Sequence, residues 1–210
     1  MEFGKTIGIL DYGMGNIASA KAGLMRAGAK NAVVVSTACE ISKCDGLVIP
    51  GVGAFKAAMQ SIRSLGMEDA IMEFAGSGRP LLGVCLGMQI LFDTGTEGGK
   101  TAGLGLLSGR VELLRGAPKL PQIGWNTVRT RKSPLWKGIA QNPYFYFVHS
   151  YACFPKDGKI VIGTTRHGAD FASAVMQGSI TGVQFHPEKS GPVGQALLGN
   201  FVEFVEKWKN

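Results

Sequence analysis

The stretch "RPLLGVCLGMQILF" (residues 79–92) decides the fold, because it places one cysteine, Cys85, between two glycines. An apolar run from Pro80 to Val84 leads into the cysteine and predicts a strand. A helix-compatible run from Met88 to Phe92 leads out of it. Glycine on both sides is typical of a sharp, crowded strand-to-helix turn. Such a turn lies at the carboxyl edge of a parallel sheet, where open α/β sheets place their functional sites.

Outward from this turn, apolar strand-like segments alternate with helix-like segments through the first half of the chain. The expected strands are 6–10, 32–36, 45–49 and 80–84, and the expected helices are 17–27, 56–65, 68–74 and 88–92. This alternation predicts an α/β fold with an open, mostly parallel, doubly wound sheet flanked by helices.

The second half of the chain reads as successive strands with short polar breaks. The strand-like runs are 109–115, 126–130, 144–154, 159–167, 171–178 and 180–187, and an amphipathic helix is expected over 191–209. These runs predict antiparallel strands added to the parallel sheet or folded over it. No linker or repeat divides the chain, so one domain over residues 1–210 is expected.

The composition fits an ordered globular protein, and its charge limits the kinds of partner that are expected. The 210 residues are 45% hydrophobic and 18% charged, with a formal net charge of +7. The densest basic cluster, "RTRKS" (129–133), is either a solvated loop or a basic face that meets an acidic protein or a phosphorylated ligand. No aromatic platform accompanies the charge, so nucleic-acid binding is not expected.

The apolar runs and the cysteines predict where the protein works. No apolar run approaches the roughly 18 residues of a membrane span, and the N-terminus reads as a first strand rather than a signal peptide. The four cysteines read as free thiols of a cytoplasmic protein. Cys39 and Cys44 lack a matching pair of further ligands, so no metal site is expected. No other cofactor is expected.

Cys85 is the candidate nucleophile. A helix N-terminus directly after it favours a thiolate, and the backbone N–H of Leu86 points to where an oxyanion would form. The spacing Gly-x-Cys-x-Gly is the thiol counterpart of the serine turn in Gly-x-Ser-x-Gly hydrolases. The alternative is a buried cysteine in a glycine-rich turn.

His186, in "GVQFHPEKS", is the candidate base. It follows an apolar run, and on an extended chain the side chain of Glu188 would point the same way and orient the imidazole. The alternative is a histidine satisfied at a strand end. His149, in "YFYFVHSY", is left open between the core and a substrate pocket.

Two glycine-rich turns complete the candidates. "IPGVGAF" (49–55) could turn a peptide N–H near Val52 and Gly53 toward an oxyanion, or be an ordinary turn. "DYGMGNIA" (11–18) nearly spells a dinucleotide-binding turn, but no acidic residue follows at the distance that a ribose requires. A capped helix start or a partner-facing loop remains for that segment.

The set "PGVGAF", "GVCLGMQ", "FVHSY" and "GVQFHPEKS", in this order, resembles the class I (triad) glutamine amidotransferases from about Ile7 to Phe204. "DYGMGNI", "GLGLLSGRV" and "PQIGWN" are similar to the branch of that family that serves histidine biosynthesis. Gln122 stands where this branch often has histidine, and His167-Gly168 where it usually has an aromatic residue and glycine.

The resemblance implies the class I glutamine amidotransferase fold and a role for each matching residue. Cys85, His186 and Glu188 would form the catalytic triad that hydrolyses glutamine, and no cofactor is implied. The implied oxyanion hole consists of Val52, Gly53 and Leu86. The positions that match glutamine-binding residues are Gly53, Gln89, Glu97, His149, Ser150 and Tyr151.

The resemblance also implies a partner subunit. Ammonia would pass to a (β/α)8-barrel cyclase that forms imidazole glycerol phosphate and an aminoimidazole carboxamide nucleotide. Asn16, Trp125, Asn126 and Lys189 match positions that face this cyclase.

Three alternatives remain open at this point. The first is a glutaminase of another pathway, such as pyridoxal phosphate or aminodeoxychorismate synthesis. The second is a non-catalytic subunit that binds glutamine or scaffolds a partner. The third is a thiol hydrolase acting on esters or peptides.

Overall fold

The computed structural model describes residues 4–209, so the ends of the expected single domain lie outside the described residues. The helices are α1 (Ile17–Arg26), α2 (Ala38–Ser42), α3 (Phe55–Ser64), α4 (Glu68–Gly76), α5 (Leu86–Gln89) and α6 (Gly191–Lys207). Three short 3-10 turns, η1 to η3, span Pro134–Trp136, Gly158–Ile160 and Pro187–Lys189. None of the described helices is long and apolar enough to cross a membrane.

The first strands form the parallel part of a large mixed sheet. They are β1 (Thr6–Leu10), β2 (Asn31–Val35), β3 (Gly46–Gly51) and β4 (Leu81–Cys85), and their order in the sheet is β2-β1-β3-β4. The doubly wound first half expected from the alternating segments is confirmed.

The later strands extend this sheet and add a small second one. They are β5 (Phe92–Gly95), β6 (Thr101–Ala102), β7 (Leu107–Leu113), β8 (Gln122–Thr127), β9 (Arg129–Thr130), β10 (Tyr144–His149), β11 (Tyr151–Pro155), β12 (Val161–His167), β13 (Ala169–Gln177) and β14 (Ile180–Val183). The main sheet continues in the order β14-β13-β11-β7-β5-β6, with β12 and β9 off this path, while β8 and β10 pair separately.

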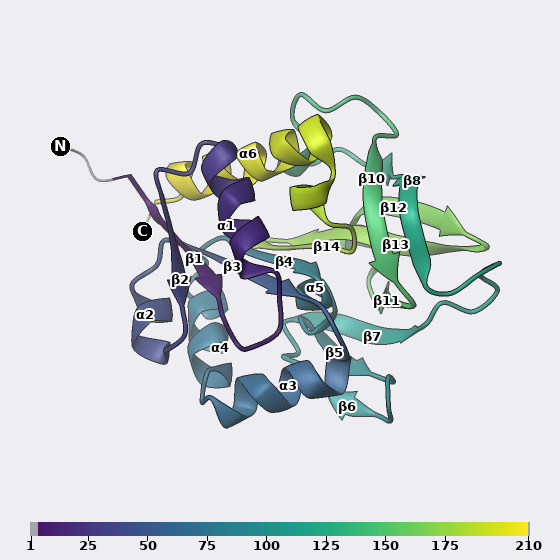
Figure 1. Cartoon of the computed structure of the whole chain (residues 1–210), viewed down its shortest axis with the longest axis horizontal. Coiled ribbons are helices and arrows are strands. Elements are labelled where there is room, and N and C mark those ends of the chain that lie inside the picture. The colour runs from purple at the N-terminus through teal and green to yellow at the C-terminus, as the bar shows by residue number, and fades with distance from the viewer. Residues whose placement is uncertain (1–3, 210) are drawn as a thin grey trace.

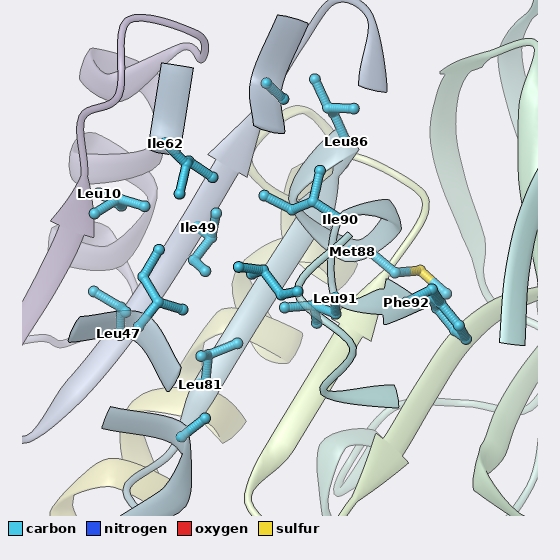
Figure 2. Packing of buried hydrophobic residues seen from close by; sticks show 14 of the residues in the cluster. Leu10, Leu47, Ile49, Ile62, Leu81, Leu86, Met88, Ile90, Leu91 and Phe92 are labelled. Carbon is cyan, nitrogen blue, oxygen red and sulfur yellow. The ribbon is translucent and has the colours of Figure 1, made fainter. Parts of the chain in front are cut away.

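Helices cover both faces of the parallel strands. In Figure 1, α1 and α6 lie on one face, and α2, α3 and α4 lie on the other. Because successive side chains of a strand point to opposite faces, β3 feeds both cores. Leu47 and Ile49 pack in the cluster that also holds Ile62 of α3, as Figure 2 shows, whereas Val48 packs in the cluster that holds Leu198 of α6.

The last strand, β14, decides where the site lies. It pairs with β4 in parallel, with Ile180 opposite Leu81 and Val183 opposite Val84. The sequence suggested an antiparallel strand here, but β14 is antiparallel only to β13. Because the carboxyl ends of parallel strands meet at one sheet edge, the segment that follows β14 arrives beside the end of β4.

The helix after Cys85 is shorter than expected. The sequence predicted a helix over 88–92, but α5 ends at Gln89 and Phe92 begins a strand. The backbone carbonyls of Ile90 and Leu91 accept hydrogen bonds from the N–H groups of Leu104 and Leu107, at 2.8 and 2.9 Å. This segment is buried on all sides, so its sequence has no polar face to mark where the helix stops.

Two further expectations were incomplete. The run 144–154 is split at Ser150 into β10 and β11, which belong to different sheets. Helix α2 was missed, although Thr37 and Glu40 form a reciprocal capping box at its start.

Candidate active site

Cys85 sits at a strained turn between β4 and α5. Its φ of 55° and ψ of −111° are values that non-glycine residues rarely adopt. A Cβ on Gly83 would lie 2.5 Å from the carbonyl oxygen of Gly87, and a Cβ on Gly87 only 1.8 Å from that of Ile49. The two flanking glycines are therefore required by the approach of α5 to β3 and β4.

The turn opens into a cavity of about 480 Å³, a size that suits small ligands. Most of the residues predicted for catalysis, the oxyanion hole and glutamine binding line it. They are Val52, Gly53, Cys85, Leu86, Gln89, Glu97, His149, Ser150, Tyr151 and His186. Segments far apart in the sequence thus supply one site at the carboxyl edge of the sheet.

His186 lies just beyond β14 and lines the same cavity as Cys85. Its Nδ1 lies 2.9 Å from Oε1 of Glu188. The structure brings this pair together in a different way from that expected, because Glu188 lies in the 3-10 turn Pro187–Lys189 and not on an extended strand. Glu188 therefore engages Nδ1 of His186 and leaves Nε2 as the ring nitrogen that could serve Cys85.

The surroundings of His186 favour its charged form. Burial alone would lower the pKa of His186, but the hydrogen bonds and charges of Cys85 and Glu188 outweigh it and raise this pKa from 6.5 to about 9. An imidazolium next to sulfur can stabilise a thiolate and can later give a proton to a leaving group.

Ser190 holds this turn in place and was missed by the sequence reasoning. Its hydroxyl donates to the carbonyl of His186 at 2.6 Å and accepts from the backbone N–H of Tyr146 at 3.0 Å. The backbone N–H of His186 also donates to the Tyr146 carbonyl, at 2.9 Å. A serine four residues after the histidine was the only sequence signal for this clamp.

The predicted oxyanion loop is fixed at its base and open at its tip. The hydroxyl of Tyr12, a second residue that sequence reasoning missed, donates to the carbonyl of Pro50 at 2.9 Å. Val52 is 44% exposed, and Gly53 has a φ of +108° that favours glycine. Leu86 is the first residue of α5, so its N–H has no acceptor within that helix.

Two polar side chains in the cavity are already oriented by the backbone. Oε2 of Glu97 accepts from the N–H of Phe55, at the start of α3, at 2.8 Å. Nε2 of Gln89 donates to the carbonyl of Tyr151 at 3.0 Å. The second oxygen of Glu97 can therefore meet a ligand ammonium group.

His149 is both buried and part of the cavity wall. Its Nδ1 lies 2.8 Å from the carbonyl of Tyr151, and its Nε2 lies 3.0 Å from the side-chain amide of Gln122. Burial lowers the pKa of His149 from 6.5 to about 4. Oε1 of Gln122 faces Nε2. A neutral ring that donates from Nδ1 must accept at Nε2, so this hydrogen bond requires the Gln122 amide to turn and present its NH₂ group.

This buried histidine predicts acid sensitivity of the fold. Because the folded pKa lies below the unfolded one, stability is complete above pH 6.5 and falls as the pH drops toward 4. We expect His149 to account for about 3 kcal/mol of lost unfolding free energy across that range. Urea unfolding of the native chain and of His149→Gln at several pH values measures it. Equal slopes for the two proteins would contradict the assignment.

The residues predicted to face a partner lie outside the cavity or at its rim. Trp125 is 55% exposed, Asn16 and Lys189 are exposed, and Lys189 also borders the cavity. Asn126 donates to the carbonyl of Arg166, and Asn16 accepts from the N–H of Ser19 as the cap of α1. These two asparagines have structural roles besides any contact with a partner.

The outer face of the β8–β10 pair is apolar and exposed. Ile123 is 64% exposed and Tyr144 is 60% exposed, and the rings of Trp125 and Tyr146 meet edge to face at 6.0 Å. In the register of the two strands, Tyr146 lies opposite Trp125 and Val148 opposite Ile123. Val148 also lines the cavity, so this apolar face continues to the cavity mouth.

Metal ligation has no support in the described part of the chain. Residues 4–209 contain no group of three or more histidine, cysteine, aspartate or glutamate side chains that could hold a metal ion. All four cysteines are free, and Cys39 is exposed while the other three are buried.

The chain is similar to known proteins over nearly its whole length. It is 46% identical over 202 residues to the imidazole glycerol phosphate synthase subunit HisH of Moorella thermoacetica, with 96% of each chain covered. It is 43% identical to the protein of the same name from Oceanobacillus iheyensis, over 95% of this chain and 99% of that one.

Solved structures agree on the fold. A crystal structure of a glutamine amidotransferase has a TM-score of 0.75 at 23% identity, covering 95% of this chain and 98% of that one. The structure of PurLQS from Thermotoga maritima has a TM-score of 0.77 at 16% identity, covering 96% and 99%. The sequence pattern of the family "Glutamine amidotransferase class-I" matches residues 8–204. The chain therefore belongs to the class I glutamine amidotransferases.

Proposed function

We propose that the chain is the glutaminase subunit of an imidazole glycerol phosphate synthase, in which it hydrolyses glutamine and delivers ammonia to a cyclase subunit for histidine biosynthesis. The observation that carries the chemistry is the line from Cys85 through His186 to Glu188 at the wall of the cavity. The assignment to this pathway is supported by the two relatives named above, because both are named as subunits of imidazole glycerol phosphate synthase.

The reaction proceeds in two steps at one sulfur. The Cys85 thiolate attacks the side-chain amide carbon of glutamine, and the imidazolium of His186 gives its proton to the leaving NH₂ group, which departs as ammonia. Water then attacks the glutamyl thioester while His186 accepts its proton. The thiolate departs and glutamate is released, so one glutamine and one water yield one glutamate and one ammonia.

Each remaining site residue has a part in this scheme. Glu188 orients His186, and the N–H of Leu86 stabilises the oxyanion together with a peptide N–H near Val52 and Gly53. Glu97 receives the substrate ammonium group. Gln89, His149, Ser150 and Tyr151 form the wall against which the amino-acid end of glutamine rests.

The cyclase docks on the apolar face that Ile123, Trp125, Tyr144 and Tyr146 present beside the cavity mouth. The cyclase subunit is a (β/α)8 barrel, and Asn16, Asn126 and Lys189 contact it around this face. An exposed apolar patch next to a site is typical of a protein–protein interface. The four free thiols support a reducing, cytoplasmic setting.

The partner controls the oxyanion loop. A second oxyanion donor is worth about 10²–10³ in rate, so a loop tip that adopts its productive conformation only in the complex keeps the free subunit slow. The exposed Val52 and the glycine at 53 leave that tip free to move, whereas Tyr12 anchors its base.

The test is glutamate release from glutamine in three mixtures: the chain alone, the chain with the cyclase subunit, and both with the cyclase's nucleotide substrate. We expect little turnover alone and an increase of about 10²-fold or more in the third mixture. Equal turnover in all three would contradict control by the partner. No turnover in any mixture would contradict the glutaminase itself.

A further inference from the structure

A buried amide lies directly beside the nucleophile. Gln184 is fully buried, and its backbone N–H donates to the carbonyl of Ser173 at 2.9 Å, which extends the pairing of β13 with β14. Its side-chain Nε2 lies 3.7 Å from Sγ of Cys85. Gln184 therefore reaches the sulfur from the same segment that carries His186.

A backbone carbonyl fixes the direction of this contact. The carbonyl of Tyr151 can only accept, so the group of Gln89 that faces it, at 3.0 Å, must be the NH₂. The same NH₂ lies 3.1 Å from the Gln184 side chain, which must present its oxygen to Gln89. The NH₂ of Gln184 is then left to face the sulfur.

We propose that Gln184 is a further catalytic residue, whose amide N–H donates a hydrogen bond to the Cys85 thiolate; the proposal rests on the glutaminase function above. An N–H donor stabilises a thiolate more than a neutral thiol, because hydrogen bonds to charged acceptors are the stronger ones. The thiolate occurs twice in the cycle, before attack on glutamine and when the thioester is hydrolysed.

The contact also couples sulfur to the substrate cavity. Gln89 lines that cavity, and its NH₂ is held by Tyr151 and Gln184 together, so only its Oε1 is available to a ligand. Gln184 thus links the Cys85 sulfur and the Gln89 side chain in one hydrogen-bonded chain. A neutral amide suits this buried position, since an ionised group would carry a large desolvation cost.

The test measures the rate at which iodoacetamide alkylates Cys85, in a Cys39→Ser background that removes the exposed thiol. Gln184→Met keeps nearly the same volume and removes the donor. Gln184→Glu keeps the oxygen toward Gln89 and replaces the donor with another oxygen. Thr165→Val is the matched control, because Thr165 is a buried residue of the same sheet whose hydroxyl donates to the Thr127 carbonyl and lies 2.8 Å from the Ser173 hydroxyl.

We expect Gln184→Met to be alkylated about tenfold more slowly at pH 7, with the deficit shrinking as the pH rises and the thiol ionises without help. The deficit of Gln184→Glu should instead grow with pH, because its carboxyl group ionises beside the sulfur. Thr165→Val should react like the background chain. In the complex, Gln184→Met should lower kcat by a similar factor.

Native alkylation rates in both folded Gln184 variants would overturn the proposal, as would an equal loss in Thr165→Val. Circular dichroism and urea unfolding identify variants that are not folded. Alkylation does not require glutamine turnover. If the variants show the expected pH trends but the native complex does not release glutamate, the sulfur contact stands and the proposed function fails.

Discussion

Replacing Cys85 by alanine abolishes glutamine-dependent synthesis in the complex, with an expected loss of at least about 10⁴-fold. The reason is that Cys85 is the proposed nucleophile, and the hydrogen-bond donors that remain at this turn cannot form the proposed thioester. Ammonia supplied as an ammonium salt should still support the cyclase, because Cys85→Ala leaves the partner face unchanged. The measurement is product formation with glutamine and with ammonium.

Cys39→Ala is the matched control for this experiment. Cys39 is exposed, lies in α2 and does not line the cavity, so its removal should leave both rates unchanged. A glutamine-dependent rate in Cys85→Ala within tenfold of the native rate would overturn the assignment of the nucleophile. Loss of the ammonium-dependent rate would instead indicate that the variant no longer assembles with the cyclase.

Replacing Gly87 by alanine should damage both folding and catalysis. Its added Cβ would lie 1.8 Å from the backbone carbonyl oxygen of Ile49, which no side-chain movement can relieve. We expect a loss of more than about 3 kcal/mol in unfolding free energy. Because α5 must move away from β3, the turn at Cys85 shifts as well, and turnover in the folded fraction should fall by about 10²-fold.

Gly76→Ala is the control for this prediction. Gly76 ends α4 without an unusual φ, and an added Cβ there has no neighbour within 4 Å. Its stability should be unchanged or slightly raised, as is usual when alanine replaces glycine in a helix. Urea unfolding and glutamine turnover of both variants give the comparison. A Gly87→Ala protein as stable and active as Gly76→Ala would show that the turn does not need glycine.

The site could be predicted from sequence where a local pattern carries the chemistry. The glycines on both sides of Cys85 form a compact sequence motif, as does His186 with Glu188, so both motifs could be recognised from the sequence. The contact that requires Gly87 could not, because it comes from the carbonyl of Ile49 on β3. The backbone conformation that brings Glu188 to the imidazole could not be predicted. A 3-10 turn and an extended strand can both bring together two side chains that are two positions apart.

Contacts between distant segments were beyond the sequence reasoning. Tyr12 reaches Pro50, and Gln184 reaches Cys85 and Gln89, only after β1, β3, β4 and β14 are assembled in their order. The end of α5 and the change of sheet at Ser150 likewise involve distant residues. Leu104 and Leu107 donate to the carbonyls of Ile90 and Leu91, and Leu114 donates to the carbonyl of Ser150. An apolar run without a polar face or a turn residue gives no sequence signal for where a helix or a strand ends.

The pairing of β14 with β4 has a consequence for the chain during its synthesis. The proposed base, His186, arrives about 100 residues after the proposed nucleophile, Cys85, because Gln184 and Cys85 are 99 positions apart and His186 follows two residues later. At about 5–20 residues per second, a ribosome-bound chain carries its cysteine for roughly 5–20 s before the histidine exists. By the proposed mechanism, nascent chains and chains that terminate before His186 lack the base, so they should not consume glutamine.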